Sequence, residues 1–162
     1  MALVVGGAAS LVVQAQTVPV AIEVTVGKTV KEKHAAAQSG VASGGEDRLL
    51  EIELKNSSSQ ALANLEVKYW LLVRDVKSKE VTIGVSDTST LTLPPHSQTV
   101  VTSAVVKCDF TPHTSTGKSV PAKGNKFYGY GVQVLEGGKI ASQTYEPTDG
   151  QTVIEEGGKK AK

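Results

Sequence analysis

The feature of this sequence that most constrains its fold is an alternation of apolar and polar residues in short segments along the chain. In the segment from Leu65 to Val73, the residues Leu, Val, Tyr, Leu and Val occupy every second position. Successive side chains of a β-strand point to opposite faces, so a segment of this kind buries one face and exposes the other. The pattern predicts strands at about residues 18–26, 50–55, 65–74, 81–85, 98–108, 127–135 and 139–145.

Turn-forming residues separate these segments. Asn56 and three serines follow the second segment, and Pro94-Pro95 ends a strand because proline has no amide donor. Glu136-Gly137-Gly138 fits a hairpin turn, since glycine permits positive φ. No long segment shows helical periodicity. We therefore expect an all-β chain, an antiparallel β-sandwich of about seven strands. A closed barrel, the alternative, would need evenly spaced hairpins rather than the long polar loops at 29–47 and 111–125.

The two ends of the chain differ in composition from the middle. Residues 1–15 carry no charge, are too short to span a membrane as a helix, and end in Val13-Gln14-Ala15, which fits a signal peptidase site. We interpret them as a signal peptide cleaved after Ala15, although no Lys or Arg precedes the apolar run; a first buried strand is the alternative. Residues 16–149 are then the sandwich, and residues 150–162 a flexible charged tail.

Charge and cysteine content narrow the range of partners. The 162 residues include 17 Lys and Arg against 16 Asp and Glu, for a net charge of +1, so electrostatics give no reason to expect nucleic acid or an anionic membrane as a partner. The length suits one domain. The one cysteine cannot close an intrachain disulfide or supply a multi-cysteine zinc site.

Two runs of the sequence resemble parts of bacterial immunoglobulin-like or fibronectin-III-like domains. The run Leu49–Asp75 is similar to their B and C strands, in which Asn and small polar residues precede a Leu-x-Val-x-Tyr strand, and the run Tyr128–Pro147 is similar to their F–G hairpin. The resemblance covers roughly residues 48–147. It implies an immunoglobulin-like sandwich and a role in surface assemblies or partner binding more often than in catalysis. The paired cysteines of antibody domains are absent.

Trp70 is the residue that most strongly suggests a binding role. By alternation it points away from the core. In one interpretation the indole packs over the backbone of Gly129 and Gly131 on the neighbouring strand. In the other it belongs to an exposed apolar patch that binds another subunit or a sugar ring. The members of that patch would be Trp70, Leu72, Phe127 and Leu135.

Cys108 and the histidines give weaker indications of a functional site than Trp70 does. Cys108 shares its register with Val106, which predicts a small buried hydrophobe; the alternative is an intermolecular disulfide in an oxidising compartment. His34, His96 and His113 are scattered among loops, without the spacing of a zinc site. No catalytic elbow, P-loop or dinucleotide motif is present in the sequence, so we expect no catalytic residue, metal or cofactor.

These observations together predict an exported, non-enzymatic structural or protein-interaction module that presents a sheet face or an edge strand to a partner or to itself. The expected location is periplasmic, outer-membrane-associated or secreted, with no integral membrane segment in the mature chain. A carbohydrate-binding module that uses Trp70 and loop aromatics is the alternative. An enzyme is the third possibility.

Overall fold

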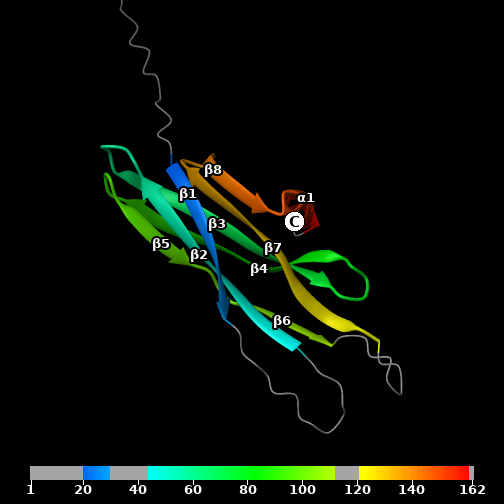
Figure 1. The fold of residues 1–162 in the computed structure, drawn as a ribbon. Coiled ribbons are helices and arrows are strands. Elements are labelled where there is room, and N and C mark those ends of the chain that lie inside the picture. The colour runs from blue at the N-terminus through cyan, green and yellow to red at the C-terminus, as the bar shows by residue number, and fades with distance from the viewer. Residues whose placement is uncertain (1–19, 30–43, 112–120, 161–162) are drawn as a thin grey trace, which may run out of the picture.

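The structure is a computed structural model that describes residues 20–29, 44–111 and 121–160. The predicted signal peptide lies outside the described residues. The described chain contains eight strands and one helix (Figure 1). The strands are β1 (Val20–Thr29), β2 (Gly44–Asn56), β3 (Leu62–Asp75), β4 (Val81–Leu93), β5 (Gln98–Thr102), β6 (Val106–Thr111), β7 (Lys123–Glu136) and β8 (Lys139–Glu146). The helix is α1 (Gly150–Lys160).

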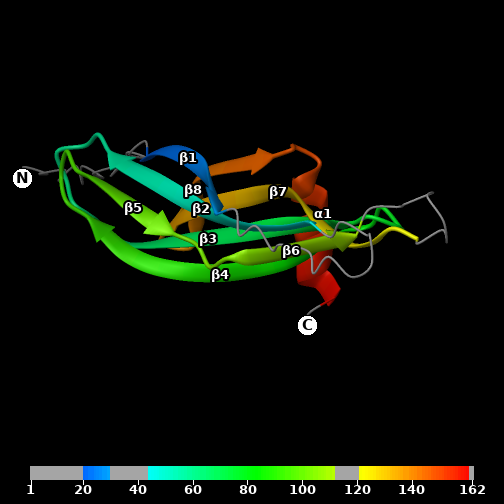
Figure 2. The ribbon, with the colours of Figure 1, turned by 60° about the horizontal axis from the view of Figure 1, so that its bottom comes forward.

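All strand pairs are antiparallel, and the strands form one curled sheet with the order β1-β2-β6-β7-β3-β4. β5 pairs with β2, and β8 pairs with β7. β6 and β7 are joined only through Phe110 with Gly124 and Thr111 with Lys123 among the described residues. The sheet bends over itself, so that β2, β5 and β6 lie against β3, β4 and β7 (Figure 2). The prediction of an all-β antiparallel chain is confirmed.

The core lies between these two parts of the curled sheet. It is built from side chains at alternate positions, as the sequence pattern predicts. Its members are Leu50, Ile52 and Leu54 of β2, Leu62, Leu65, Val67, Tyr69, Leu71 and Val73 of β3, Leu93 of β4, Val106 and Cys108 of β6, and Tyr130, Val132 and Val134 of β7.

β2 and β7 begin earlier than predicted, at Gly44 and Lys123, inside the predicted loops at 29–47 and 111–125, and two further boundaries also differ. The segment at 98–108 is interrupted between β5 and β6, where the buried Ser103 hydroxyl accepts the amide of Leu50 at 2.8 Å and donates to the carbonyl of Ala104 at 2.9 Å. The serine thus satisfies backbone groups on two segments while the chain bends. In the other case, the predicted strand at 81–85 continues to Leu93 as the single long strand β4.

The predicted flexible tail is wrong for residues 150–160, which form α1. Its residues Gly150, Ile154 and Gly157 are spaced by four and three positions, the spacing of one helix face. Ile154 is 6% exposed, and the two glycines lie close to Leu72 and Ile83 of the sheet. The helix therefore packs on the outer face of β3, β4 and β7, opposite the core. Its sequence has few apolar residues, so these contacts stabilise it and not a long apolar stripe.

Candidate functional site

The outer face of the sheet near α1 holds the predicted patch, and the structure does not bring its four members together as one exposed surface. Leu72 is fully buried, and a methyl group added at Gly150 of α1 would lie 2.9 Å from its Cδ1. Leu135 is 8% exposed. Trp70 is partly exposed and paired in register with Gly131. Helix α1 thus covers part of the face that the sequence predicted to be open.

Phe127 lies on the opposite face from Trp70, contrary to the sequence prediction. Between Leu72 and Val73 the β3–β7 register shifts by one residue, so that Val73 pairs with Phe127. The extra residue on β7 is Tyr128, and the side chains that precede it, Phe127 among them, have the opposite face from the one that alternation predicts. Phe127 consequently packs against the core, with the guanidinium of Arg48 5.5 Å from the centre of its ring.

Trp70 and Tyr145 flank Gly131 in one row across β3, β7 and β8. A methyl group added at Gly131 would lie 2.5 Å from Ile154 Cδ1 and 2.8 Å from Tyr145 Cδ1, so these two side chains cover the glycine. The hydroxyl of Tyr145 accepts a 2.6 Å hydrogen bond from Gln133 Nε2 in the next row. The row thus has Ile154 of α1 over its middle at Gly131, with Trp70 on one side, Tyr145 on the other and the Gln133 amide at its border.

The open edge of β4 is a second candidate surface, which the sequence analysis did not single out. Within the described ranges, β4 pairs with β3 on one side and with no strand on the other. Ser86, Asp87 and Thr88 are all exposed at its middle. The amide of Thr88 donates to its neighbour Asp87 Oδ1 at 2.7 Å, so this bond is made within β4. The signal in the sequence is a 13-residue strand that contains no Lys, Arg or Pro.

Asp87 is the one charged residue of β4. It is in register with Tyr69, a core residue of β3, so its carboxylate stands on the inner side of the edge. A charge in that position is a known device that prevents unspecific edge-to-edge pairing. The edge of β4 is therefore open, and the charge of Asp87 at its centre disfavours unspecific pairing with another edge.

Cys108 is buried, as the preferred interpretation of the sequence predicted. It is 1% exposed and belongs to the core cluster. Burial raises the pKa of its thiol to about 11, and the negative charge of Glu46 adds to the effect. A sulfur in this environment is a poor nucleophile and is closed to a thiol of a second chain.

His96 is exposed, has a φ of 50°, and its amide donates to the carbonyl of Ser58 at 3.1 Å, which gives it a role in a turn. His34 and His113 lie outside the described residues. Among the residues that the structure describes, no three His, Cys, Asp or Glu side chains are grouped as a metal site would need. In the same part of the chain, no helix has the length and apolar character to cross a bilayer.

Comparisons with known proteins give distant fold neighbours. No protein-family model matches the chain, and no curated protein matches it. Among solved structures, a β-glucuronidase from glycoside hydrolase family 2 has 12% identity and a TM-score of 0.38 over 81% of this chain. The match spans 11% of the length of that enzyme. The Northeast Structural Genomics Consortium target SoR45 has 16% identity and a TM-score of 0.38, over 78% of this chain and 84% of that one.

Proposed function

We propose that this chain is an exported, non-enzymatic protein-interaction module with an immunoglobulin-like sandwich, and that it pairs the open edge of β4 with an extended strand of another protein. The observation that carries the proposal is that β4 ends the strand order, with exposed residues at its middle and the Thr88 amide bonded to a side chain of β4 itself. Addition of a strand satisfies the backbone groups of such an edge, and side chains at alternate positions then select the partner.

The neighbourhood of β4 supports a protein partner. β5 lies in the part of the curled sheet that faces β4, and the two strands come into contact there (Figure 2). Val100 of β5 is 58% exposed, and Val105, just before β6, is 43% exposed. Exposed apolar side chains of this kind are surface that a protein partner can bury.

Asp87 argues for a partner of different sequence over a second copy. An antiparallel pair of two β4 strands centred on Asp87 would place the two carboxylates opposite each other, and like charges opposed across strands destabilise the pair. A strand with Lys or Arg opposite Asp87 would instead form an ion pair. It would also replace the bond that Asp87 makes to the amide of Thr88.

A nine-residue peptide that alternates Val with Thr and carries a central Lys tests the proposal. The control is the same peptide with Asp in place of the central Lys. The Lys peptide should bind more tightly and slow amide hydrogen exchange along β4. The Thr88→Pro variant, which lacks this amide, should lose binding while keeping its fold. Protection absent from β4, or equal binding by Thr88→Pro, would refute the proposal.

A glycan is the second candidate ligand, and the row of Trp70, Gly131 and Tyr145 favours it. Sugar rings stack on aromatic side chains and take hydrogen bonds from amides at the border, such as that of Gln133. A glycan array with the wild type and Trp70→Ala tests this function. Binding that depends on Trp70 but not on Thr88 would assign the outer face, and not the edge, as the binding surface.

A further inference from the structure

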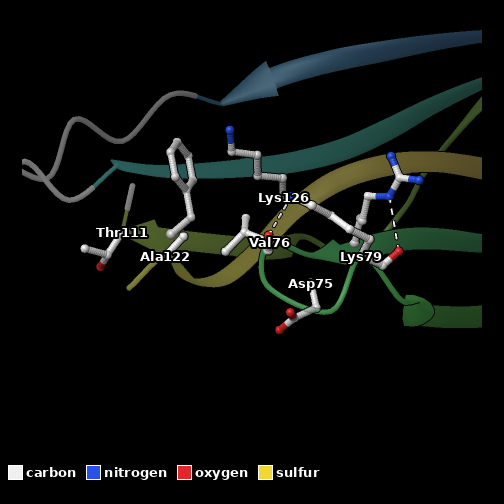
Figure 3. Close-up of a pocket in the computed structure, with 8 residues that line it drawn as sticks. Asp75, Val76, Lys79, Thr111, Ala122 and Lys126 are labelled. Carbon is white, nitrogen blue, oxygen red and sulfur yellow. Dashed lines mark hydrogen bonds between the residues drawn. The ribbon is translucent and has the colours of Figure 1, made fainter. Parts of the chain in front are cut away.

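A pocket at the far end of the sheet from the β7–β8 hairpin collects three cationic side chains. It lies where the turn after β3 meets the end of β6 and the start of β7 (Figure 3). Its volume is about 460 Å³, within the size range of small-molecule sites. Its charged lining residues are Arg74, Asp75, Lys79 and Lys126, and its other walls are Val76, Phe110, Thr111 and Ala122.

Arg74 and Lys126 are direct register partners on β3 and β7. Like charges opposite each other on antiparallel strands repel, so this pair disfavours the fold unless something compensates for it. No ion pair with a carboxylate among the described residues neutralises either side chain. The pair of Arg74 and Lys126 thus places two positive charges side by side at this end of the sheet.

Neutral groups hold the cations in place. Arg74 Nε donates to the carbonyl of Lys79 at 3.3 Å, and its guanidinium lies 5.0 Å from the centre of the Tyr128 ring. Lys126 Nζ lies 4.3 Å from the centre of the Phe110 ring. Carbonyl and π contacts orient a cation without cancelling its charge. Both cations therefore remain available to an anion.

Asp75 carries the negative charge of the pocket lining, and its carboxylate is bound within the turn. Its Oδ1 accepts hydrogen bonds from the amides of Lys77 at 2.8 Å and Ser78 at 2.7 Å, and these bonds lower the pKa of the carboxyl. Figure 3 shows its carboxylate turned away from Lys126. Lys79 Nζ, the third cation, donates to the carbonyl of Val76 at 2.7 Å. The carboxylate thus stays charged and shapes the turn, and the lining carries three positive charges against the one negative charge of Asp75.

We propose that this pocket binds a small organic anion, in which a phosphate or carboxylate group lies between Arg74 and Lys126 and an apolar body lies against Phe110. A guanidinium presents donors in a fork that matches the oxygens of either group. The apolar surface of Phe110, Val76 and Ala122 provides the contact for the rest of the ligand. This site is separate from the edge of β4 and does not depend on the strand-pairing function.

The probes are phenyl phosphate, benzoate and inorganic phosphate, titrated at constant ionic strength and followed by amide chemical shifts. We expect saturable shifts at Val76, Phe110 and Lys126, and tighter binding of phenyl phosphate than of inorganic phosphate. The comparison of phenyl phosphate with benzoate identifies the preferred anionic group. Lys126→Met should weaken binding at least threefold, whereas Lys139→Met, a matched exposed lysine on β8, should leave it unchanged.

Thermal unfolding gives an independent measurement. Phenyl phosphate should raise the Tm of the wild type, because a ligand that binds only the folded state stabilises it. The same addition should have little effect on the double variant Arg74→Gln/Lys126→Met, whose fold is checked by circular dichroism. Shifts that do not saturate, shifts that sodium chloride reproduces, or equal weakening in Lys139→Met would overturn the proposal.

Discussion

Ile154 of α1 lies directly over the backbone of Gly131 on β7: a methyl group added at Gly131 would lie 2.5 Å from Ile154 Cδ1. Gly131 therefore provides the space in which the helix rests on the sheet. The side chain of Tyr145 encloses the same space from β8. This contact links the C-terminal helix to the centre of the sheet.

Gly131→Ala should lower the free energy of unfolding despite the better strand propensity of alanine. Relief of backbone entropy is worth about 0.5–1 kcal/mol, whereas overpacking at a tight site costs about 1–3 kcal/mol. Urea unfolding measures the change, and limited proteolysis after residue 150 reports whether α1 has detached. The cost of Gly131→Ala should shrink in an Ile154→Ala background, because the smaller side chain leaves room. Additive effects would show that the two residues do not share the contact.

Asn56 is a buried polar residue on which three segments converge. Its Nδ2 donates to the carbonyls of Gln60 at 2.8 Å, Leu93 at 3.2 Å and Pro94 at 2.9 Å. Its Oδ1 accepts the amide of Ser58 at 3.0 Å. It is 2% exposed, so water cannot replace these partners. The side chain thus joins the end of β2 to the end of β4.

Substitution at Asn56 should be strongly destabilising. Asn56→Ala leaves carbonyls without a donor and should cost about 1–3 kcal/mol of unfolding free energy. Asn56→Asp should cost more at neutral pH, about 3–5 kcal/mol, because it places an unpaired carboxylate among carbonyl oxygens. Its extra cost should diminish as pH falls and the carboxyl is protonated. Asn64→Asp, at an exposed position of β3, is the matched control. Equal effects of the two Asp variants would contradict this account.

The alternating pattern predicted the strands and most of the core, because side-chain direction in a strand follows from residue parity alone. It placed Leu65, Val67 and Tyr69 on the inner face, where the structure has them. Parity fails at a bulge, and Phe127 was therefore assigned to the wrong face. A bulge depends on the geometry of the paired strand, which a local pattern does not contain.

The candidate sites were harder to predict than the fold. The three apolar contacts of α1 involve two glycines, so the helix carries no strong amphipathic signal of its own. The basic pocket joins Arg74, Lys126 and Phe110, which are far apart in sequence and meet only through strand pairing. Residue type suggested Trp70, but burial of its neighbour Leu72 depends on the helix that the sequence pattern did not reveal.

Cys108 should be unreactive in the folded protein. Its thiol is 1% exposed and its pKa is raised to about 11, so the reactive thiolate is scarce at neutral pH. A thiol-specific reagent such as DTNB should label it only after denaturation, and non-reducing electrophoresis of native protein should show no disulfide-linked dimer. Rapid labelling under native conditions would mean that β6 opens readily.

Tyr130 provides a test of stability against pH. Its hydroxyl donates to Glu146 Oε2 at 2.9 Å, and burial, followed by this hydrogen bond, raises the pKa of the phenol to about 12 from its ordinary value of 10. Below pH 10 the phenol is protonated in both the folded and the unfolded chain, and its contribution to stability is complete. Between pH 10 and about 12 the unfolded chain loses the proton first, so the contribution declines as pH rises.

Tyr130→Phe should therefore be less stable than the wild type at pH 9, and the difference should narrow as pH rises from 10 to 11.5. The narrowing is at most about 1.4 kcal/mol per pH unit, the limit for one proton. Urea unfolding at a series of pH values measures it, and lysine titration cancels because both proteins share the same lysines. Tyr145→Phe is the control, since the hydroxyl of Tyr145 bonds the side-chain amides of Gln133 and Gln143 and not a carboxylate. A difference between wild type and Tyr130→Phe that stays constant with pH would show that the phenol ionises equally in both states.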